Sequence, residues 1–144
     1  MPKSNNEPNK RPMQRTVCII DDDLVSQFAT RYCLEQYEED FTILTFGSAE
    51  EGLVYCAERI DEKEDLPDII FLDLVMGDMD GWAFLENLQL ISENVKQPEV
   101  FVLSAFTNSK DRAVAKSHKL ISGYFDKPLN KTNLLKVFEK KMTK

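Results

Sequence analysis

Acidic, hydroxyl and ammonium side chains come just after four apolar segments of this chain. In chain order they are Asp21, Asp22, Asp23, Asp73, Ser104 and Lys127. Clustered carboxylates raise one another's pKa unless a cation lies between them, and Mg²⁺ typically takes one or two carboxylates together with a phosphate. A carboxylate can also attack phosphorus and form an acyl phosphate, a transfer that depends mainly on charge neutralisation. If these side chains meet, they favour Mg²⁺-dependent phosphoryl transfer to a carboxylate.

The segments that must position these side chains alternate between two patterns. A helical pattern of apolar residues follows each short apolar run, and the runs predict strands at residues 17–20, 41–46, 69–72, 100–103 and 123–125. Alternating strands and helices imply a parallel sheet, and uniformly apolar strands imply helices on both of its faces. In such a sheet the residues beyond the strand ends meet at one edge, where ligands bind. The sequence therefore predicts a doubly wound α/β fold that brings the acids, Ser104 and Lys127 together.

The first helical pattern, over residues 24–37, places large apolar side chains on one face of a helix. These residues are Val25, Phe28, Ala29, Tyr32 and Cys33. Such spacing is typical of a helix face that packs on the core. We therefore expect this face to lie against the sheet, and we expect Asp23 to cap the start of the helix.

Length and charge indicate one acidic domain. The chain has 144 residues, which suits a single, stand-alone domain over residues 16–144 behind a disordered tail over residues 1–15. The net charge is −7, and the tail holds four basic residues against one acidic residue, so the remainder carries about −10. Nucleic-acid affinity rests on basic residues that neutralise phosphates. The charge therefore argues against a nucleic-acid partner.

The remaining composition indicates a protein of a reducing compartment. The three cysteines lie among apolar residues, as buried thiols do, and their number is odd. No apolar run is long enough to span a bilayer, and the N-terminus lacks the apolar core of a signal peptide. We therefore expect a cytoplasmic location and no membrane partner.

Four segments resemble the receiver domain of response regulators, the CheY-like family of two-component signalling. They are residues 18–23, 71–81, 102–105 and 123–128, and the likeness extends over about residues 16–142. The resemblance implies a flavodoxin-like parallel sheet of five strands in the order 2-1-3-4-5. It also implies a protein that accepts a phosphoryl group and is not an enzyme in the ordinary sense, although it promotes its own phosphorylation and dephosphorylation.

The resemblance assigns metal and acceptor roles to four residues. Asp73 would be the phospho-acceptor and a ligand of Mg²⁺, the implied cofactor. Asp22 would bind the metal directly, and Asp21 would bind it through water. Val75 would contribute only its backbone carbonyl.

The resemblance assigns the switch to three further residues. Lys127 would pair with the acceptor and then with the phosphoryl group, and Ser104 would move to hydrogen-bond that group. Tyr124 would turn inward as the hydroxyl moves. The peptide bond between Lys127 and Pro128 would be cis. One departure is Gly77, which stands where the family often has proline and which loosens the acceptor loop.

The resemblance also implies the partners. A sensor histidine kinase or a histidine phosphotransfer protein would donate the phosphoryl group in a phosphorelay. A downstream protein would then bind the surface of residues 108–119, 123–125 and 130–142. The chain would be a monomer or a phosphorylation-linked homodimer.

Two alternatives stay open at this point. Residues 19–25 also resemble the opening motif of haloacid-dehalogenase-type phosphatases, with Asp21 as nucleophile and Asp23 as general acid. That fold needs an acidic pair after the lysine, yet the only acid beyond Lys127 is Glu139, and Asp73 is left unexplained. The second alternative is a protein-binding module on the receiver fold that works without phosphorylation.

Overall fold

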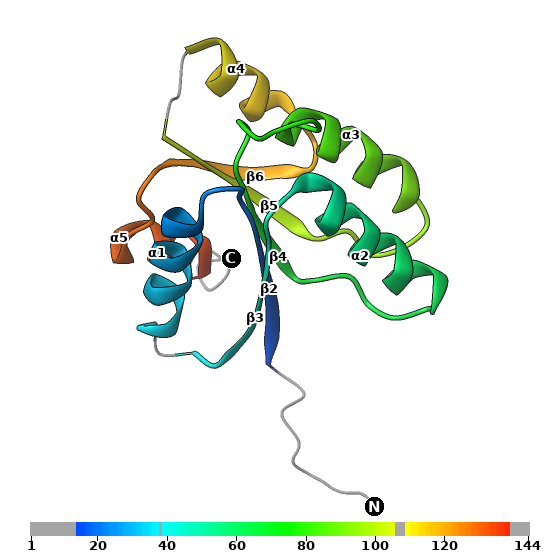
Figure 1. Ribbon diagram of the computed structural model, residues 1–144, viewed down its shortest axis with the longest axis horizontal. Coiled ribbons are helices and arrows are strands. Elements are labelled where there is room, and N and C mark those ends of the chain that lie inside the picture. Colours follow the sequence, from blue (N-terminus) through cyan, green and yellow to red (C-terminus); the bar gives the residue numbers. More distant parts are fainter. Residues whose placement is uncertain (1–13, 38, 106–108, 139–144) are drawn as a thin grey trace, which may run out of the picture.

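A parallel sheet forms the centre of the computed structural model, which describes residues 14–37, 39–105 and 109–138 (Figure 1). Its strands lie in the order β3-β2-β4-β5-β6, and every neighbouring pair is parallel. The strand bounds are β2 Arg15–Ile20, β3 Phe41–Phe46, β4 Ile69–Leu72, β5 Glu99–Ser104 and β6 Ile121–Asp126. Counted along the described chain, this is the order 2-1-3-4-5, so the predicted fold class is confirmed.

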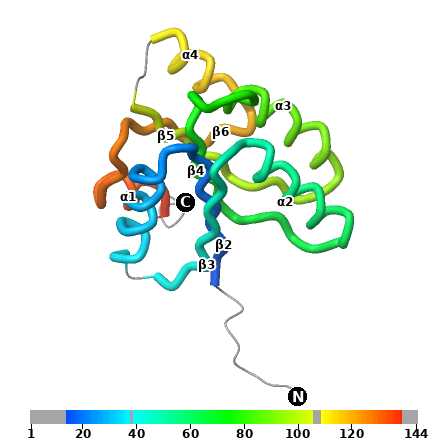
Figure 2. The backbone as a smooth tube through the Cα atoms, viewed as in Figure 1, coloured from blue at the N-terminus to red at the C-terminus, as the bar shows by residue number. Residues whose placement is uncertain are grey.

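Helices cover both faces of the sheet, as the smooth trace of the backbone also shows (Figure 2). The helix bounds are α1 Leu24–Glu35, α2 Ala49–Asp61, α3 Gly81–Ile91, α4 Ser109–Ser117 and α5 Lys131–Phe138. Helices α1 and α5 lie on one face, α2 and α3 lie on the other, and α4 packs beside β6 (Figure 1). None of these helices is both long enough and apolar enough to cross a membrane.

Residues 17–20 of strand β2 explain why polar and apolar side chains do not alternate along the central strands. Successive side chains of a strand point to opposite faces. Cys18 and Ile20 accordingly join the core cluster under α2 and α3, whereas Val17 and Ile19 join the cluster under α1 and α5. Both faces are therefore buried, and no polar alternation is possible along this strand.

The prediction that the apolar face of α1 packs on the sheet is wrong. Val25, Phe28 and Tyr32 are 78%, 71% and 57% exposed, and Ala29 is exposed as well. Cys33 alone of the predicted set packs partly against the core, and the buried residues of α1 are Thr30 and Leu34. The helix is therefore rotated relative to its apolar stripe.

Two polar side chains of α1 account for this rotation. Gln27 donates a hydrogen bond to the backbone oxygen of Asp21 at 2.6 Å, and Arg31 donates one to the backbone oxygen of Ile43 at 3.2 Å. These bonds pair carbonyl groups next to the sheet, whose burial without partners is costly. The side of α1 that faces the sheet is thus partly polar, and the apolar stripe is left outside.

Arg15 marks the start of the described domain. It is the first residue of β2, where it pairs with Phe41, and its side chain forms an ion pair with Glu39 at 2.8 Å. The prediction that the tail reaches residue 15 is therefore wrong at Arg15, because the strand already begins there. Residues 1–13 of the predicted tail lie outside the described residues.

The orientation of α1 predicts that two substitutions change the free energy of unfolding by very different amounts. Leu34→Ala should lower the free energy of unfolding by about 2–5 kcal/mol, because Leu34 is fully buried. Phe28→Ala should change it by at most about 0.5 kcal/mol, because its ring is exposed. Urea denaturation of both variants measures this difference. A larger loss for Phe28→Ala than for Leu34→Ala would contradict the orientation of α1.

Candidate functional site

Backbone hydrogen bonds at the strand ends set the position of the candidate site. The amide of Asp21 donates to the backbone oxygen of Phe46 at 3.1 Å, and the amide of Asp73 donates to that of Ile20 at 3.0 Å. Both bonds continue the ladders of the sheet one residue beyond its strands. Carboxylate oxygens of Asp21, Asp22 and Asp73 consequently come within 4.8 Å of one another.

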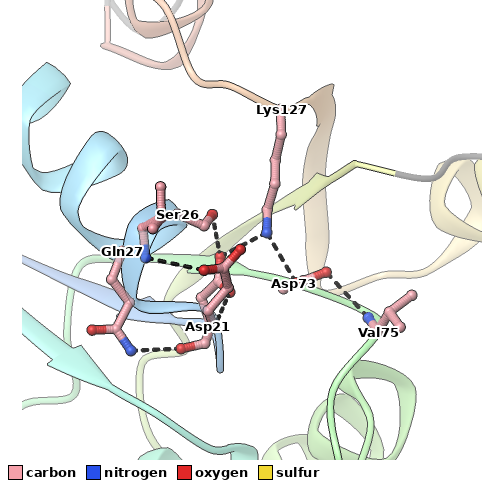
Figure 3. A network of polar contacts seen from close by, with 8 residues as sticks. Asp21, Ser26, Gln27, Asp73, Val75 and Lys127 are labelled. Atoms are coloured by element: carbon pink, nitrogen blue, oxygen red, sulfur yellow. Dashed lines mark hydrogen bonds and ion pairs between the residues drawn. The ribbon is translucent and has the colours of Figure 1, made fainter.

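One ammonium group lies between two of these carboxylates. The Nζ atom of Lys127 is 2.8 Å from Oδ2 of Asp21 and 3.0 Å from Oδ2 of Asp73 (Figure 3). Both carboxylates are buried, at 2% and 7% exposure. Lys127 is held there because its own amide donates to the backbone oxygen of Ser104 at 2.9 Å. The ion pairs therefore join three strand ends.

Burial and charge act in opposite directions on Asp73. Burial raises the pKa of Asp73, while hydrogen bonds from Lys127 and from the amide of Val75 lower it, and the net result is a raised pKa. Burial alone would lower the pKa of Lys127, but its hydrogen bonds to Asp21 and Asp73 outweigh burial and raise it. The ammonium group of Lys127 thus compensates the negative charge of both carboxylates.

The loop between β4 and α3 orients Asp73 from the other side. Oδ1 of Asp73 accepts a hydrogen bond from the amide of Val75 at 3.1 Å, so both carboxylate oxygens have donors. The loop turns back at Gly81, whose amide donates to the backbone oxygen of Leu74 at 3.0 Å. A Cβ atom at Gly81 would lie 2.8 Å from the backbone of Asp73 and Leu74. Only glycine lets α3 begin this close to Asp73.

Asp21 is held by α1 as well as by Lys127. Ser26 donates to Oδ2 of Asp21 at 2.6 Å, and the amide of Asp23 donates to Oδ1 at 3.0 Å. Asp23 itself caps α1 by accepting from the amide of Val25 at 3.0 Å, as predicted. Neither Ser26 nor Gln27 was among the predicted site residues. Their only sequence signal is their position in the first turns of the helix, five and six residues after Asp21.

The predicted switch residues lie beside this cluster. Ser104 is buried as the last residue of β5, and Tyr124 lies on the neighbouring strand β6. The hydroxyl oxygen of Tyr124 is buried and has no hydrogen-bond partner among the described residues, and burial is the main cause of its raised pKa. The guanidinium of Arg112 from α4 lies 5.0 Å from the centre of the Tyr124 ring and pairs with Asp126 at 2.6 Å.

The structure thus gathers most of the predicted site. It brings Asp21, Asp22, Asp73 and Lys127 together, with the amide of Val75 on Asp73. The peptide bond between Lys127 and Pro128 is cis, in agreement with the geometry that the resemblance implies. The side chain of Val75 is 61% exposed and leaves only backbone groups for the site.

The donor set suits Mg²⁺. The cluster offers carboxylate oxygens and neither sulfur nor imidazole, and hard cations such as Mg²⁺ prefer such ligands. Asp22 is exposed, so the cluster opens to solvent on one side. A metal that keeps several of its waters fits an open site of this kind.

Comparison with known proteins identifies the family. Residues 17–139 match the family model of the response regulator receiver domain, and the chain therefore belongs to that family. Receiver domains are signalling modules of the CheY-like, two-component class.

Solved structures agree with this assignment. A two-component response regulator from Cytophaga hutchinsonii is 21% identical, with a TM-score of 0.77 over 91% of this chain and 99% of its own. A receiver protein from Dyadobacter fermentans is 24% identical, with a TM-score of 0.75 over 87% and 95%. The receiver domain of the histidine kinase CKI1 from Arabidopsis thaliana, solved in complex with Mg²⁺, is 20% identical, with a TM-score of 0.74 over 88% and 90%. At these identities the likeness establishes the fold.

Asp73→Asn should stabilise the metal-free protein at neutral pH. Because burial raises the pKa of Asp73, the folded chain holds a proton there up to a higher pH than the unfolded chain does. Stability therefore falls as the pH rises from the unfolded to the folded pKa, and the ionised group is a net cost above that interval. Asparagine lacks this cost.

Urea denaturation in EDTA over a series of pH values measures the effect. The free energy of unfolding of the variant should exceed that of the wild type at pH 7, and the difference should shrink as the pH falls from neutral towards the ordinary pKa of aspartate. A difference that grows on acidification would contradict the account.

Proposed function

We propose that this receiver domain accepts a phosphoryl group on Asp73 in a Mg²⁺-dependent reaction. The donor is a sensor histidine kinase or a histidine phosphotransfer protein, and the signal passes to a downstream protein in a phosphorelay. The observation that carries the proposal is the pair of buried carboxylates, Asp21 and Asp73, that share the ammonium of Lys127 at 2.8 and 3.0 Å. A cytoplasmic location and a monomer or phosphorylation-linked homodimer are parts of the same proposal.

In the proposed transfer, a carboxylate oxygen of Asp73 attacks the phosphorus of a phosphohistidine. The new P–O bond forms as the P–N bond breaks, the imidazole of the donor leaves, and an acyl phosphate results. The amide of Val75 and the ammonium of Lys127, at 3.1 and 3.0 Å, hold the attacking carboxylate in place. Positioning and neutralisation of charge are the main requirements of phosphoryl transfer.

The metal would be held by the acid cluster. Asp22 and Asp73 would bind Mg²⁺ directly, Asp21 would bind it through water, and Val75 would offer its backbone carbonyl. When bound, Mg²⁺ supplies positive charge that neutralises the phosphoryl oxygens and the clustered acids. The three carboxylates within 4.8 Å of one another support this assignment.

The proposed conformational switch consists of movements of three side chains. Lys127 moves from the carboxylates to the phosphoryl group, whose charge is larger. Ser104 donates its hydroxyl to the phosphoryl group, and Tyr124 follows into the space that the hydroxyl leaves. Tyr124 lies on β6, which pairs with the strand that ends at Ser104, and this adjacency supports the proposed coupling. The equilibrium of the last elements of the sheet then shifts towards an active state.

The output face in this proposal consists of α4, β6 and α5. The described helix α4 has nine residues, and only Ala115 among them is buried. Its exposed Arg112 pairs with Asp126, and such exposed pairs contribute little to stability. An element held by so few buried contacts can change position at small cost.

Phosphorylation should alter amide hydrogen exchange on the output face. The amides of residues 109–117 and 121–126 should change their exchange rates severalfold, because their contacts depend on Tyr124 and Arg112. Helix α2 is the internal control and should exchange at the same rate in both states. Mass spectrometry of the exchanged protein gives both quantities. If a fully phosphorylated sample showed unchanged exchange on α4 and β6, these elements would be excluded as the output face.

The acceptor is tested by intact mass after incubation with acetyl phosphate. Wild-type protein should gain one phosphoryl group with Mg²⁺ and none with EDTA, because the charge of the acid cluster must be neutralised. Asp73→Asn should gain none, whereas Asp78→Asn, which changes an exposed acid of the same loop, should behave as the wild type does.

The other outcomes separate the alternative functions. A wild-type protein that gains no phosphoryl group would contradict the proposal and favour a binding module that works without phosphorylation. Turnover of a generic phosphate ester, lost on substitution of Asp21 and retained in Asp73→Asn, would favour the phosphatase.

A further inference from the structure

The hydroxyl of Ser26 contacts the acid that does not accept phosphate. It donates to Oδ2 of Asp21 at 2.6 Å, and Lys127 Nζ lies 2.8 Å from the same oxygen (Figure 3). The amide of Asp23 donates to Oδ1 at 3.0 Å. Since Asp21 is only 2% exposed, these three donors take the place of the water that would surround an exposed carboxylate.

Ser26 has a fixed position relative to Asp21. Asp23 caps the start of α1, and Gln27 donates to the backbone oxygen of Asp21 at 2.6 Å, so the first turns of the helix are tied to the end of β2. Ser26 lies between these two attachments and is half-buried. Its hydroxyl therefore reaches Asp21 without reorganisation of the helix.

Not all three donors stay on Asp21 in the proposed function. Lys127 also pairs with Asp73 at 3.0 Å, and in the proposed function it moves to the phosphoryl group. The amide of Asp23 contacts only Oδ1. Once Lys127 leaves, Ser26 is the side chain that still donates to Oδ2.

We propose that Ser26 is a positioning residue for the phosphoryl-transfer site. Its hydroxyl holds the carboxylate of Asp21 in one orientation while Lys127 changes partner, and this inference rests on the proposed function. Because Oδ2 accepts from Ser26 and pairs with Lys127, Oδ1 is the oxygen of Asp21 that would be left to bind Mg²⁺ through water. Partners that orient a ligand in this way commonly contribute tenfold or more to metal affinity.

Two substitutions at Ser26 and one matched control test this role. Ser26→Ala removes the donor, and Ser26→Thr keeps a hydroxyl at the same carbon. Ser92→Ala is the control, because Ser92 ends α3 away from Asp73 and its hydroxyl donates to the backbone oxygen of Leu88, also at 2.6 Å. Calorimetric titration with MgCl₂ gives the dissociation constant, and intact mass gives the rate of phosphoryl uptake from acetyl phosphate. Thermal melting in EDTA reports whether each variant folds.

We expect Ser26→Ala to bind Mg²⁺ about tenfold more weakly and to take up phosphate more slowly. Ser26→Thr should return both quantities close to the wild-type values, and Ser92→Ala should not change them. A Ser26→Ala variant that matches an active wild type in both quantities would overturn the inference and leave the proposed function intact. A folded Ser26→Thr variant as weak as Ser26→Ala would overturn it as well. Wild-type protein that neither binds Mg²⁺ nor takes up phosphate would contradict both.

Discussion

A single ammonium group between two buried carboxylates is the constraint on which this site depends. Lys127 lies 2.8 Å from Asp21 and 3.0 Å from Asp73, and both acids are almost inaccessible to water. Without a cation between them, one of the two acids would take up a proton. A carboxylate that is protonated is a poor nucleophile, so in the proposed function the ion pairs keep Asp73 reactive. Because Lys127 pairs with two carboxylates, a new negative charge at Asp73 can also draw its ammonium group away from Asp21.

The parallel sheet supplies this arrangement because its strands end at one edge. The backbone continues the ladder from Ile20 to Asp73 and from Ser104 to Lys127, so the acid and the ammonium come from strand ends fixed by the same hydrogen bonds that hold the sheet. Apolar side chains on both faces bury residues 17–20 of β2 and the whole of β4. The charges consequently meet on buried residues, whereas α4 has only one buried residue among those described. A buried Asp73 beside an element with few buried contacts suits the proposed phosphorylation switch.

Sequence patterns predicted the parts of this structure that depend on a run of apolar residues or on a single residue type. The apolar runs identified all five described strands, and the acid that followed β4 identified Asp73. The orientation of α1 could not be predicted in this way, because Gln27 and Arg31 face the sheet and pair with backbone oxygens of Asp21 and Ile43. A stripe of Val25, Phe28 and Tyr32 was therefore expected to be buried and is exposed. Ser26 was missed for a related reason: a serine in the first turns of a helix has no distinctive pattern until its distance to Asp21 is known.

A crystal structure of the protein with Mg²⁺ and beryllofluoride, which mimics a phosphoryl group on a carboxylate, tests the central claim most directly. The account predicts beryllofluoride on Asp73 and the metal on Asp22 and Asp73. It also predicts Lys127 Nζ within hydrogen-bond distance of a fluorine and no longer on Asp21. Lys127 still bridging Asp21 and Asp73 beside a bound beryllofluoride would contradict the account, as would beryllofluoride bound at any other acid.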